Sequence, residues 1–173
     1  MSLIVFADNT LAIPVYEHTG FEVVQKVDLR GNEFIKMEIK FSDIELAFEY
    51  VSSAPMTSNT AVLCNKTGDI FYSSDYDEDE IPEAVYYRDD CIEIPHKNDL
   101  DLGKNLVFEF VDQYLSDDFE RVRRIFKKRS AYARYKDLLE RRGFLKKWYD
   151  FENTRQTETI RKWCEENGIM LVS

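Results

Sequence analysis

The sequence predicts an α+β fold from a change in hydrophobic period along the chain. Up to about residue 95, apolar residues alternate with polar ones or form short continuous runs, as they do in strands. From Leu100 onward they recur every three or four positions, as on amphipathic helices. The 173 residues are 44% apolar and 14% aromatic, which excludes a disordered chain. We therefore expect one or two globular domains.

The first 40 residues show a β-α-β-β order. We expect a strand at 3–7, a helix at 10–18 that Asn9 or Thr10 caps and Gly20 ends, and strands at 21–29 and 34–41. The first strand has no neighbour before it, and an unpaired edge favours pairing with another strand. We therefore expect this segment to pack on the rest of the chain or to form a homodimer.

The middle of the chain predicts a helix followed by a small antiparallel sheet. Ser42 and Glu45 have the spacing of a capping box, and Ile44, Ala47, Phe48 and Val51 would share one helix face. Strands are expected at 61–65, 69–73 and 91–95, with a hairpin turn at 66–68, an acidic loop at 75–80 and a short irregular or helical piece from Pro82.

Helical periodicity continues to the C-terminus and predicts a four-helix cluster. The inward faces are expected to carry the following apolar residues: Leu102, Leu106, Phe110 and Tyr114; Phe119, Val122, Ile125 and Phe126; Tyr132, Tyr135, Leu138 and Leu139; Trp148, Phe151, Ile160 and Trp163. Ser130 is a candidate N-cap and Gly143 a natural residue after a helix end.

Charge is distributed unevenly along the chain. The formal net charge of −10 combines a basic stretch, 121–147, in which 12 Lys+Arg oppose two acids, with an acidic stretch, 69–93, in which 10 Asp+Glu oppose one Arg. Solvated helix faces explain the basic stretch best, because a core pattern lies beneath it and because a chain of pI about 4.8 repels polyanions. Nucleic-acid binding through 121–147 is the alternative. The possible interaction surface consists of Arg121, Arg124, Lys128, Arg134, Arg141, Trp148 and Tyr149.

Motifs for metal or redox chemistry are incomplete. Asp75, Asp77 and Asp79 begin like a calcium loop, but Glu80 and Tyr86 stand where that loop needs Gly and Glu. These three aspartates are therefore candidates only for opportunistic metal binding in a solvated loop. The cysteines, Cys64, Cys91 and Cys164, are far apart, and we expect reduced, mostly buried thiols and no zinc site.

The segment 9–39 resembles the C-terminal end of a GCN5-related N-acetyltransferase. The matching residues are Asn9, Ala12, Tyr16, Gly20, Phe21, Gly31 and Met37. The resemblance implies a contact of Asn9 with coenzyme A and a general-acid role for Tyr16 toward the departing thiolate. The family's glycine-rich pyrophosphate loop is missing, since no two of the six glycines lie within three positions of each other. We therefore expect a truncated segment, no bound cofactor, and a packing role for Tyr16.

The remaining 41–173 is similar to an uncharacterised bacterial protein family of unknown function. The segments that carry the similarity are Ala131, Tyr132, Tyr135, Lys136 and Asp137, then Trp148, Tyr149 and Phe151, then 163–169. Relatives have Gly-Arg-Gly where this chain has Lys128-Arg129-Ser130. The resemblance implies a fold unit and no activity.

These observations predict two domains, 1–40 and 41–173, in a cytoplasmic, acidic protein. The start MSLIVFADNT has no basic segment like that of a secretory signal. We expect a non-enzymatic binding or regulatory module whose partner is a protein or a small molecule. The alternative is an acetyltransferase-related protein that keeps coenzyme A affinity or needs a missing N-terminal half.

Overall fold

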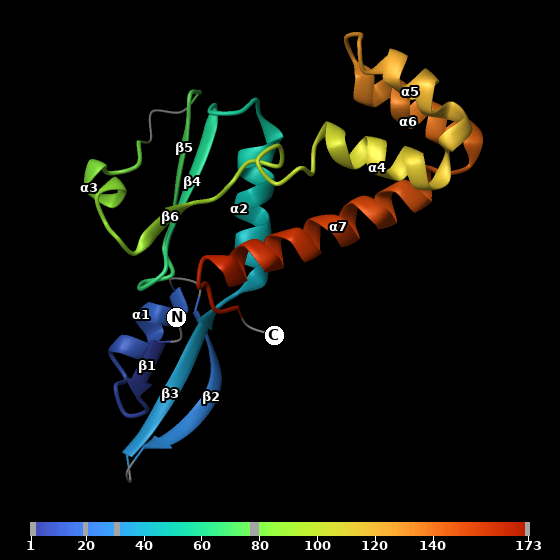
Figure 1. The fold of residues 1–173 in the computed structure, drawn as a ribbon. Coiled ribbons are helices and arrows are strands. Elements are labelled where there is room, and N and C mark those ends of the chain that lie inside the picture. The colour runs from blue at the N-terminus through green and yellow to red at the C-terminus, as the bar shows by residue number, and fades with distance from the viewer. Residues whose placement is uncertain (1–2, 19–20, 30–31, 77–79, 172–173) are drawn as a thin grey trace. The chain divides into compact units, whose positions relative to one another are not determined.

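A computed structural model describes residues 3–18, 21–29, 32–76 and 80–171, and these form two compact units. Unit 1 runs to His96 and resumes at Ile160, whereas unit 2 comprises Lys97–Thr159. Figure 1 shows strands and helices together in the first part of the chain and helices alone after it, which confirms the α+β class. The domain boundary predicted at residues 40 and 41 lies inside unit 1.

The N-terminal segment of unit 1 has the predicted β-α-β-β order. Its elements are β1 (Leu3–Phe6), α1 (Ala12–His18), β2 (Phe21–Leu29) and β3 (Asn32–Ile39). The three strands form an antiparallel sheet in the order β1-β3-β2. Asn9 caps α1 as expected, because its Oδ1 accepts a hydrogen bond of 3.1 Å from the backbone N–H of Ala12. Gly20 and Gly31 lie outside the described residues.

The next helix, α2 (Phe41–Ser53), buries the predicted face of Ile44, Ala47, Phe48 and Val51. The predicted capping box is wrong. The chain passes from β3 into α2 through Lys40 alone, so Ser42 already lies in the first turn, and no side chain caps the helix. A cap needs an extended backbone, which Ser42 therefore does not have.

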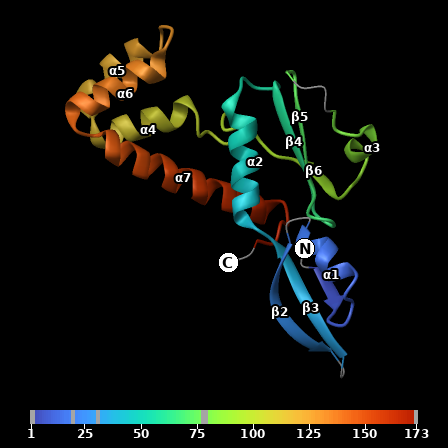
Figure 2. The ribbon, with the colours of Figure 1, turned by 180° about the vertical axis from the view of Figure 1, so that it is seen from behind.

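A second antiparallel sheet of unit 1 has the order β5-β4-β6. It contains β4 (Asn59–Cys64), β5 (Ile70–Ser74) and β6 (Cys91–Glu93), and α3 (Glu83–Tyr86) lies between β5 and β6 in the chain. Residues 61–64 of β4 are all buried. Figures 1 and 2 show why: α2 lies on one side of the sheet and α3 on the other.

Two of the three cysteines form a disulfide, which corrects the expectation of reduced thiols. Cys64 and Cys91 are directly opposite each other in the β4–β6 register, and their sulfurs are bonded. Cys164 is free and buried, as expected, and burial raises the pKa of its thiol to about 12. The pairing was missed because the two positions are 27 residues apart and become neighbours only through strand pairing.

Unit 2 is the predicted helix cluster. It contains α4 (Lys104–Tyr114), the short 3-10 helix η1 (Ser116–Asp118), α5 (Phe119–Ile125), α6 (Ala131–Arg142) and the first part of α7 (Leu145–Glu166). Its core is built around Trp148, whose ring packs edge-on against Phe110 and Tyr135 at centroid distances of 5.2 Å. None of the described helices combines the length and the apolar character that crossing a membrane requires.

The ends of α6 differ from each other. Gly143 follows the helix in the left-handed conformation, at φ 73°, as predicted. Ser130 precedes it at φ 56° and its side chain makes no capping hydrogen bond, so the predicted cap is wrong. A capping residue needs an extended backbone, and the left-handed turn at Ser130 does not supply one.

Candidate functional site

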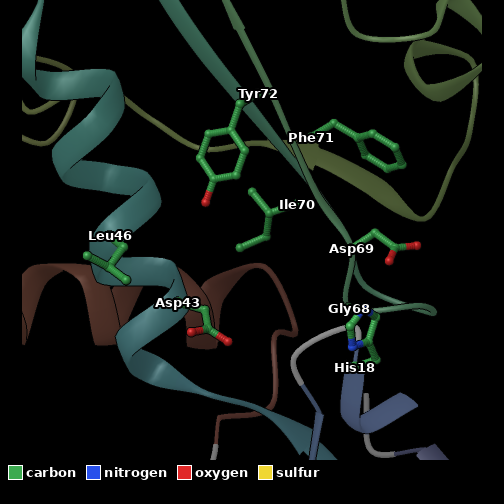
Figure 3. Close-up of a pocket in the computed structure, with 8 residues that line it drawn as sticks. All are labelled: His18, Asp43, Leu46, Gly68, Asp69, Ile70, Phe71 and Tyr72. Carbon is green, nitrogen blue, oxygen red and sulfur yellow. The ribbon is translucent and has the colours of Figure 1, made fainter. Parts of the chain in front are cut away.

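A pocket of about 600 Å³ opens between α2 and β5 in unit 1. Figure 3 shows Asp43 and Leu46 on α2 facing Tyr72 and Ile70 on β5, with His18 and Asp69 at the hairpin end. The described lining residues are His18, Asp43, Leu46, Gly68, Asp69, Ile70, Phe71 and Tyr72. The carboxyl group of Asp69 and the ring of Phe71 point away from α2, to the other side of β5. The pocket thus combines the carboxylate of Asp43 with one imidazole, one phenol ring and apolar side chains.

The α2 wall is positioned by the buried face of that helix. Ile44 and Phe48 lie in the core, so Asp43 and Leu46, three positions apart, share a face that points away from it. Leu46 is 62% exposed, although leucine is usually buried. Its methyl groups are therefore available to a ligand.

The opposite wall is tied to α2 by the side chain of Asn59. Its Nδ2 donates to the backbone carbonyl of Tyr50 at 2.9 Å, and its Oδ1 accepts from Oγ of Ser74 at 2.9 Å. These bonds join the end of α2 to the end of β5. The rings of Tyr50 and Tyr72 also meet edge-to-face, with centroids 5.1 Å apart. The pocket is therefore preformed rather than created by ligand binding.

The hairpin end of the pocket depends on Gly68. Its φ of 78° is left-handed, and its backbone N–H donates to the carbonyl of Cys64 at 2.8 Å. The ring of Phe21 occupies the space where a Cβ at residue 68 would lie. Glycine is thus required both by the turn and by the close approach of β2. Gly68 thereby sets the position of Asp69, the next lining residue.

The electrostatic character of the pocket is acidic. No lysine or arginine occurs among its described lining residues, whereas Asp43 contributes a carboxylate on the side of α2 that faces Tyr72. Burial raises the pKa of Tyr72, and the nearby charge of Asp43 raises it further. Tyr72 therefore keeps its proton and presents a neutral ring and a hydroxyl. Cationic groups fit such a lining best, because carboxylates pair with them and aromatic faces attract them.

The residues that the acetyltransferase resemblance singled out lie elsewhere. Asn9 caps α1, and the ring of Tyr16 packs edge-on against Phe21 with centroids 6.1 Å apart. Neither is among the described residues that line the pocket. The ring contact of Tyr16 is the packing role expected for it.

The acidic loop shows no metal centre in its described part. Asp75 is exposed, while Asp77 and Asp79 lie outside the described residues. Over the part of the chain that the structure describes, no group of three histidine, cysteine, aspartate or glutamate residues is arranged to hold a metal ion.

The structure removes one residue from the predicted interaction surface and shows that others already have partners. Trp148 is 1% exposed and belongs to the core of unit 2, so it is removed from that surface. Three arginines are exposed but engaged: Arg121 pairs with Asp118, while Arg124 and Arg141 donate to backbone carbonyls of their own helices. Tyr149 is exposed beneath the ammonium group of Lys136. Of the predicted surface residues, only Lys128 and Arg134 are exposed with side chains that have no partner among the described residues.

Sequence reasoning did not find the pocket, because its residues come from three separate segments. His18, Asp43 and Asp69 carry no local motif, and their segments come together only in the fold. The exposed Leu46, one turn after Asp43 on an otherwise amphipathic helix, was the available signal.

Comparisons with protein-family models, curated proteins and solved structures give no match.

Proposed function

We propose that this chain is a non-enzymatic binding module whose unit 1 pocket receives a cationic group from its partner. The observation that carries this proposal is the lining itself, in which the Asp43 carboxylate faces the ring of Tyr72 and no described lysine or arginine occurs. A lysine or arginine side chain of a partner protein, or a small organic amine, has the matching chemistry. Its methylene stem packs against Leu46 and Ile70 while its charge lies near Asp43.

A titration with a basic probe tests the proposal. A fluorescein-labelled peptide of alternating lysine and glycine is titrated with the full chain, and binding is followed by fluorescence anisotropy. We expect Asp43→Asn to weaken binding about five- to tenfold, the effect of losing one charged contact of about 1 kcal/mol. Equal binding of a glutamate–glycine peptide contradicts the proposal.

A matched control separates the pocket from the general negative field of unit 1. Asp89 is exposed in the same unit and outside the pocket lining. Asp89→Asn removes the same charge, and we expect it to change the affinity less than twofold at 0.15 M salt, where exposed charges are screened beyond about 8 Å. An effect equal to that of Asp43→Asn would assign the binding to net charge instead of the pocket.

The alternative is an acetyltransferase-related protein that binds coenzyme A. Its support is the set of residues in 9–39 named above, together with the β-α-β-β order in which they lie. A thermal-shift titration with acetyl-coenzyme A distinguishes the two proposals, because a ligand at 100 times its Kd stabilises a protein by about 2.7 kcal/mol. Reproducible stabilisation that Asn9→Ala abolishes favours the acetyltransferase relationship.

We also propose that the N-terminal segment forms a homodimer. Among the described strands, β1 pairs with β3 alone, and Ile4, Phe6, Leu11 and Val15 are large apolar residues exposed nearby in the chain. Sedimentation velocity should then show a dimer at micromolar concentration that Leu11→Glu dissociates. Met56→Glu, at an exposed apolar position outside this segment, serves as the control. A monomer at all concentrations contradicts the proposal.

A cytoplasmic location remains a proposal, and the Cys64–Cys91 disulfide gives it a test. Stable disulfides occur mainly in oxidising compartments. Rapid acid quenching of cells, followed by alkylation and mass spectrometry, reports the state of the two thiols. Alkylated Cys64 and Cys91 support a reducing cytoplasm, and an intact disulfide contradicts it.

A further inference from the structure

The cations of 121–147 fall into two groups that differ in their contacts. Most of them are engaged within unit 2, by an acidic side chain, a backbone carbonyl or an aromatic ring. This engaged group consists of Arg121, Arg123, Arg124, Lys136, Arg141, Arg142, Lys146 and Lys147. The remaining four, Lys127, Lys128, Arg129 and Arg134, are exposed, and their side chains have no ion pair, hydrogen bond or ring contact with any described residue. We call these four residues the basic corner.

The basic corner is compact in the chain. It occupies the turn between α5 and α6 and the first turn of α6, a span of eight residues that contains no acidic residue. Arg134 lies one helical turn above Ser130, because its N–H donates to the carbonyl of that residue. Four like charges so close together repel each other, and an external anion relieves this repulsion. The free cations therefore indicate a partner with several negative charges.

The span of the basic corner also contains an aromatic side chain, Tyr132. Tyr132 is 43% exposed, and its ring is held edge-on by Phe126 with centroids 5.1 Å apart. Tyr149, by contrast, lies beneath the ammonium group of Lys136, 5.1 Å from its ring centroid. The ring of Tyr132 is therefore held in place by Phe126 and remains accessible to a ligand beside the basic corner. Phosphate-binding cations next to an exposed aromatic ring are the elements of a surface that binds single-stranded nucleic acid.

We propose that the basic corner binds single-stranded nucleic acid, with its four cations on the phosphates and Tyr132 stacked on a base. The overall charge of −10 does not oppose this, because it is concentrated in unit 1. Unit 2 has 15 Lys+Arg against 12 Asp+Glu, a net charge of +3, whereas unit 1 has 8 against 21, a net charge of −13. At physiological salt, the field at an exposed site is set by charges within about 8 Å. An anionic membrane is the less suitable partner, since Tyr132 is the only large apolar or aromatic side chain of 127–134 that is strongly exposed.

Salt dependence provides the first test. Fluorescein-labelled oligo(dT) and oligo(U) of twelve nucleotides are titrated with the full chain at 50 to 300 mM NaCl, and anisotropy is measured. Four phosphate contacts to a single strand predict a slope of about −3 in log K against log salt, or a loss of about 50-fold between 50 and 200 mM. We expect Lys127→Gln/Lys128→Gln to halve this slope. A slope near zero overturns the proposal.

A double variant with the same change of charge is the control. Arg123 pairs with Glu120 and Lys146 pairs with Asp150, so both are engaged cations of the same unit. Arg123→Gln/Lys146→Gln should leave the slope within about half a unit of the unmodified chain. If it lowers the slope as much as Lys127→Gln/Lys128→Gln, the basic corner is not the binding surface, and the proposal is wrong.

The stacking contact is tested by Tyr132→Leu, which keeps an apolar side chain against Phe126. We expect about tenfold weaker binding of both oligonucleotides at every salt concentration, with an unchanged slope, and no effect of Tyr149→Leu. Vesicles containing phosphatidylserine and a polyglutamate peptide are titrated in parallel. Binding of either with the affinity of oligo(U), together with no effect of Tyr132→Leu, identifies a general anion surface and overturns the nucleic-acid assignment.

Discussion

Tyr135 is a fully buried tyrosine in the core of unit 2. It is 0% exposed, and its hydroxyl has no hydrogen-bond partner among the described residues. Burial raises the pKa of this tyrosine, and the charge of Glu152 raises it further. The ring contributes to the core through Trp148 and Phe126, whereas the hydroxyl was taken out of water without compensation.

Tyr135→Phe should therefore stabilise the protein. It removes an unsatisfied buried hydroxyl and keeps the ring, so we expect a gain of about 1 kcal/mol in the free energy of unfolding, measured by urea titration. Tyr132→Phe changes an exposed tyrosine on the same helix and should change stability by less than about 0.5 kcal/mol. A loss of stability in Tyr135→Phe would mean that this hydroxyl has a partner in solution.

Glu152 makes the stability of unit 2 depend on pH. Burial raises the pKa of this carboxyl, while the attraction of Lys136 and Lys97 lowers it by less. The folded state therefore holds this proton more tightly than the unfolded state. Stability from this group is complete below the unfolded pKa of about 4.3 and is lost as pH rises through the higher folded pKa. Glu152→Gln cannot ionise, so its stability relative to the unmodified chain should increase between pH 4 and pH 7 in urea titrations.

A comparison of two left-handed glycines, Gly68 and Gly143, measures how much the close contact with Phe21 adds to the cost of a side chain at residue 68. Gly68→Ala and Gly143→Ala both place a side chain at positive φ, which costs about 1–2 kcal/mol. A Cβ at residue 143 meets open space, whereas one at residue 68 meets the Phe21 ring. We expect Gly68→Ala to lose at least 1 kcal/mol more, by thermal or urea unfolding. Equal losses would show that the ring moves aside at no cost.

At the scale of elements, β4 and β6 are joined by both hydrogen bonds and a disulfide. Reduction, or Cys64→Ser/Cys91→Ser, releases a loop of 27 residues and should cost roughly 3–4 kcal/mol on the loop-entropy model. Thiol titration with Ellman's reagent in denaturant should find one thiol per chain without reductant and three after reduction. Three thiols in the unreduced protein would contradict the pairing.

Helix and strand positions were predictable because they follow local periodicity. The buried face of α2 and the aromatic faces of α4 and α6 repeat at helical spacing, so neighbouring residues in the chain are sufficient to find them. The start of α2 was predicted wrongly, because its position depends on how β3 leaves its sheet. The Cys64–Cys91 pairing was missed for a similar reason, since strand register is set by long-range contacts.

The candidate site was less predictable than the fold. The pocket residues His18, Asp43 and Tyr72 come from α1, α2 and β5, and none of these elements carries a functional motif of its own. In the basic stretch 121–147, composition alone did not distinguish the cations whose side chains have a partner from those whose side chains have none. The separation depends on acids such as Asp118, which lies 24 residues before its partner Arg142.

At the scale of the whole molecule, the charge asymmetry of the sequence becomes a difference between units. Unit 1 carries −13 and unit 2 carries +3. Salt screens the repulsion between the like charges of unit 1, which stabilises that unit. Salt also screens the ion pairs of unit 2, such as Arg155–Glu109, which weakens their contribution to stability. Raising NaCl from 20 to 300 mM should therefore slow amide hydrogen exchange in unit 1 and leave it unchanged or faster in unit 2. A uniform response would contradict this division.

The closing contact of unit 1 comes from the far end of the chain. The N–H of Ile39 donates to the carbonyl of Met170 at 3.4 Å, Ile39 bridges to Leu171, and the guanidinium of Arg161 lies 4.0 Å from the centroid of the Phe41 ring. Ile160, Cys164 and Ile169 are also buried there. During translation, all residues of unit 2 emerge from the ribosome as one uninterrupted stretch, while unit 1 must wait for 160–171. We therefore expect unit 2, although most of it is encoded after unit 1, to reach its native state first. We also expect ribosome-bound chains that end near residue 159 to expose the incomplete core of unit 1 to chaperones.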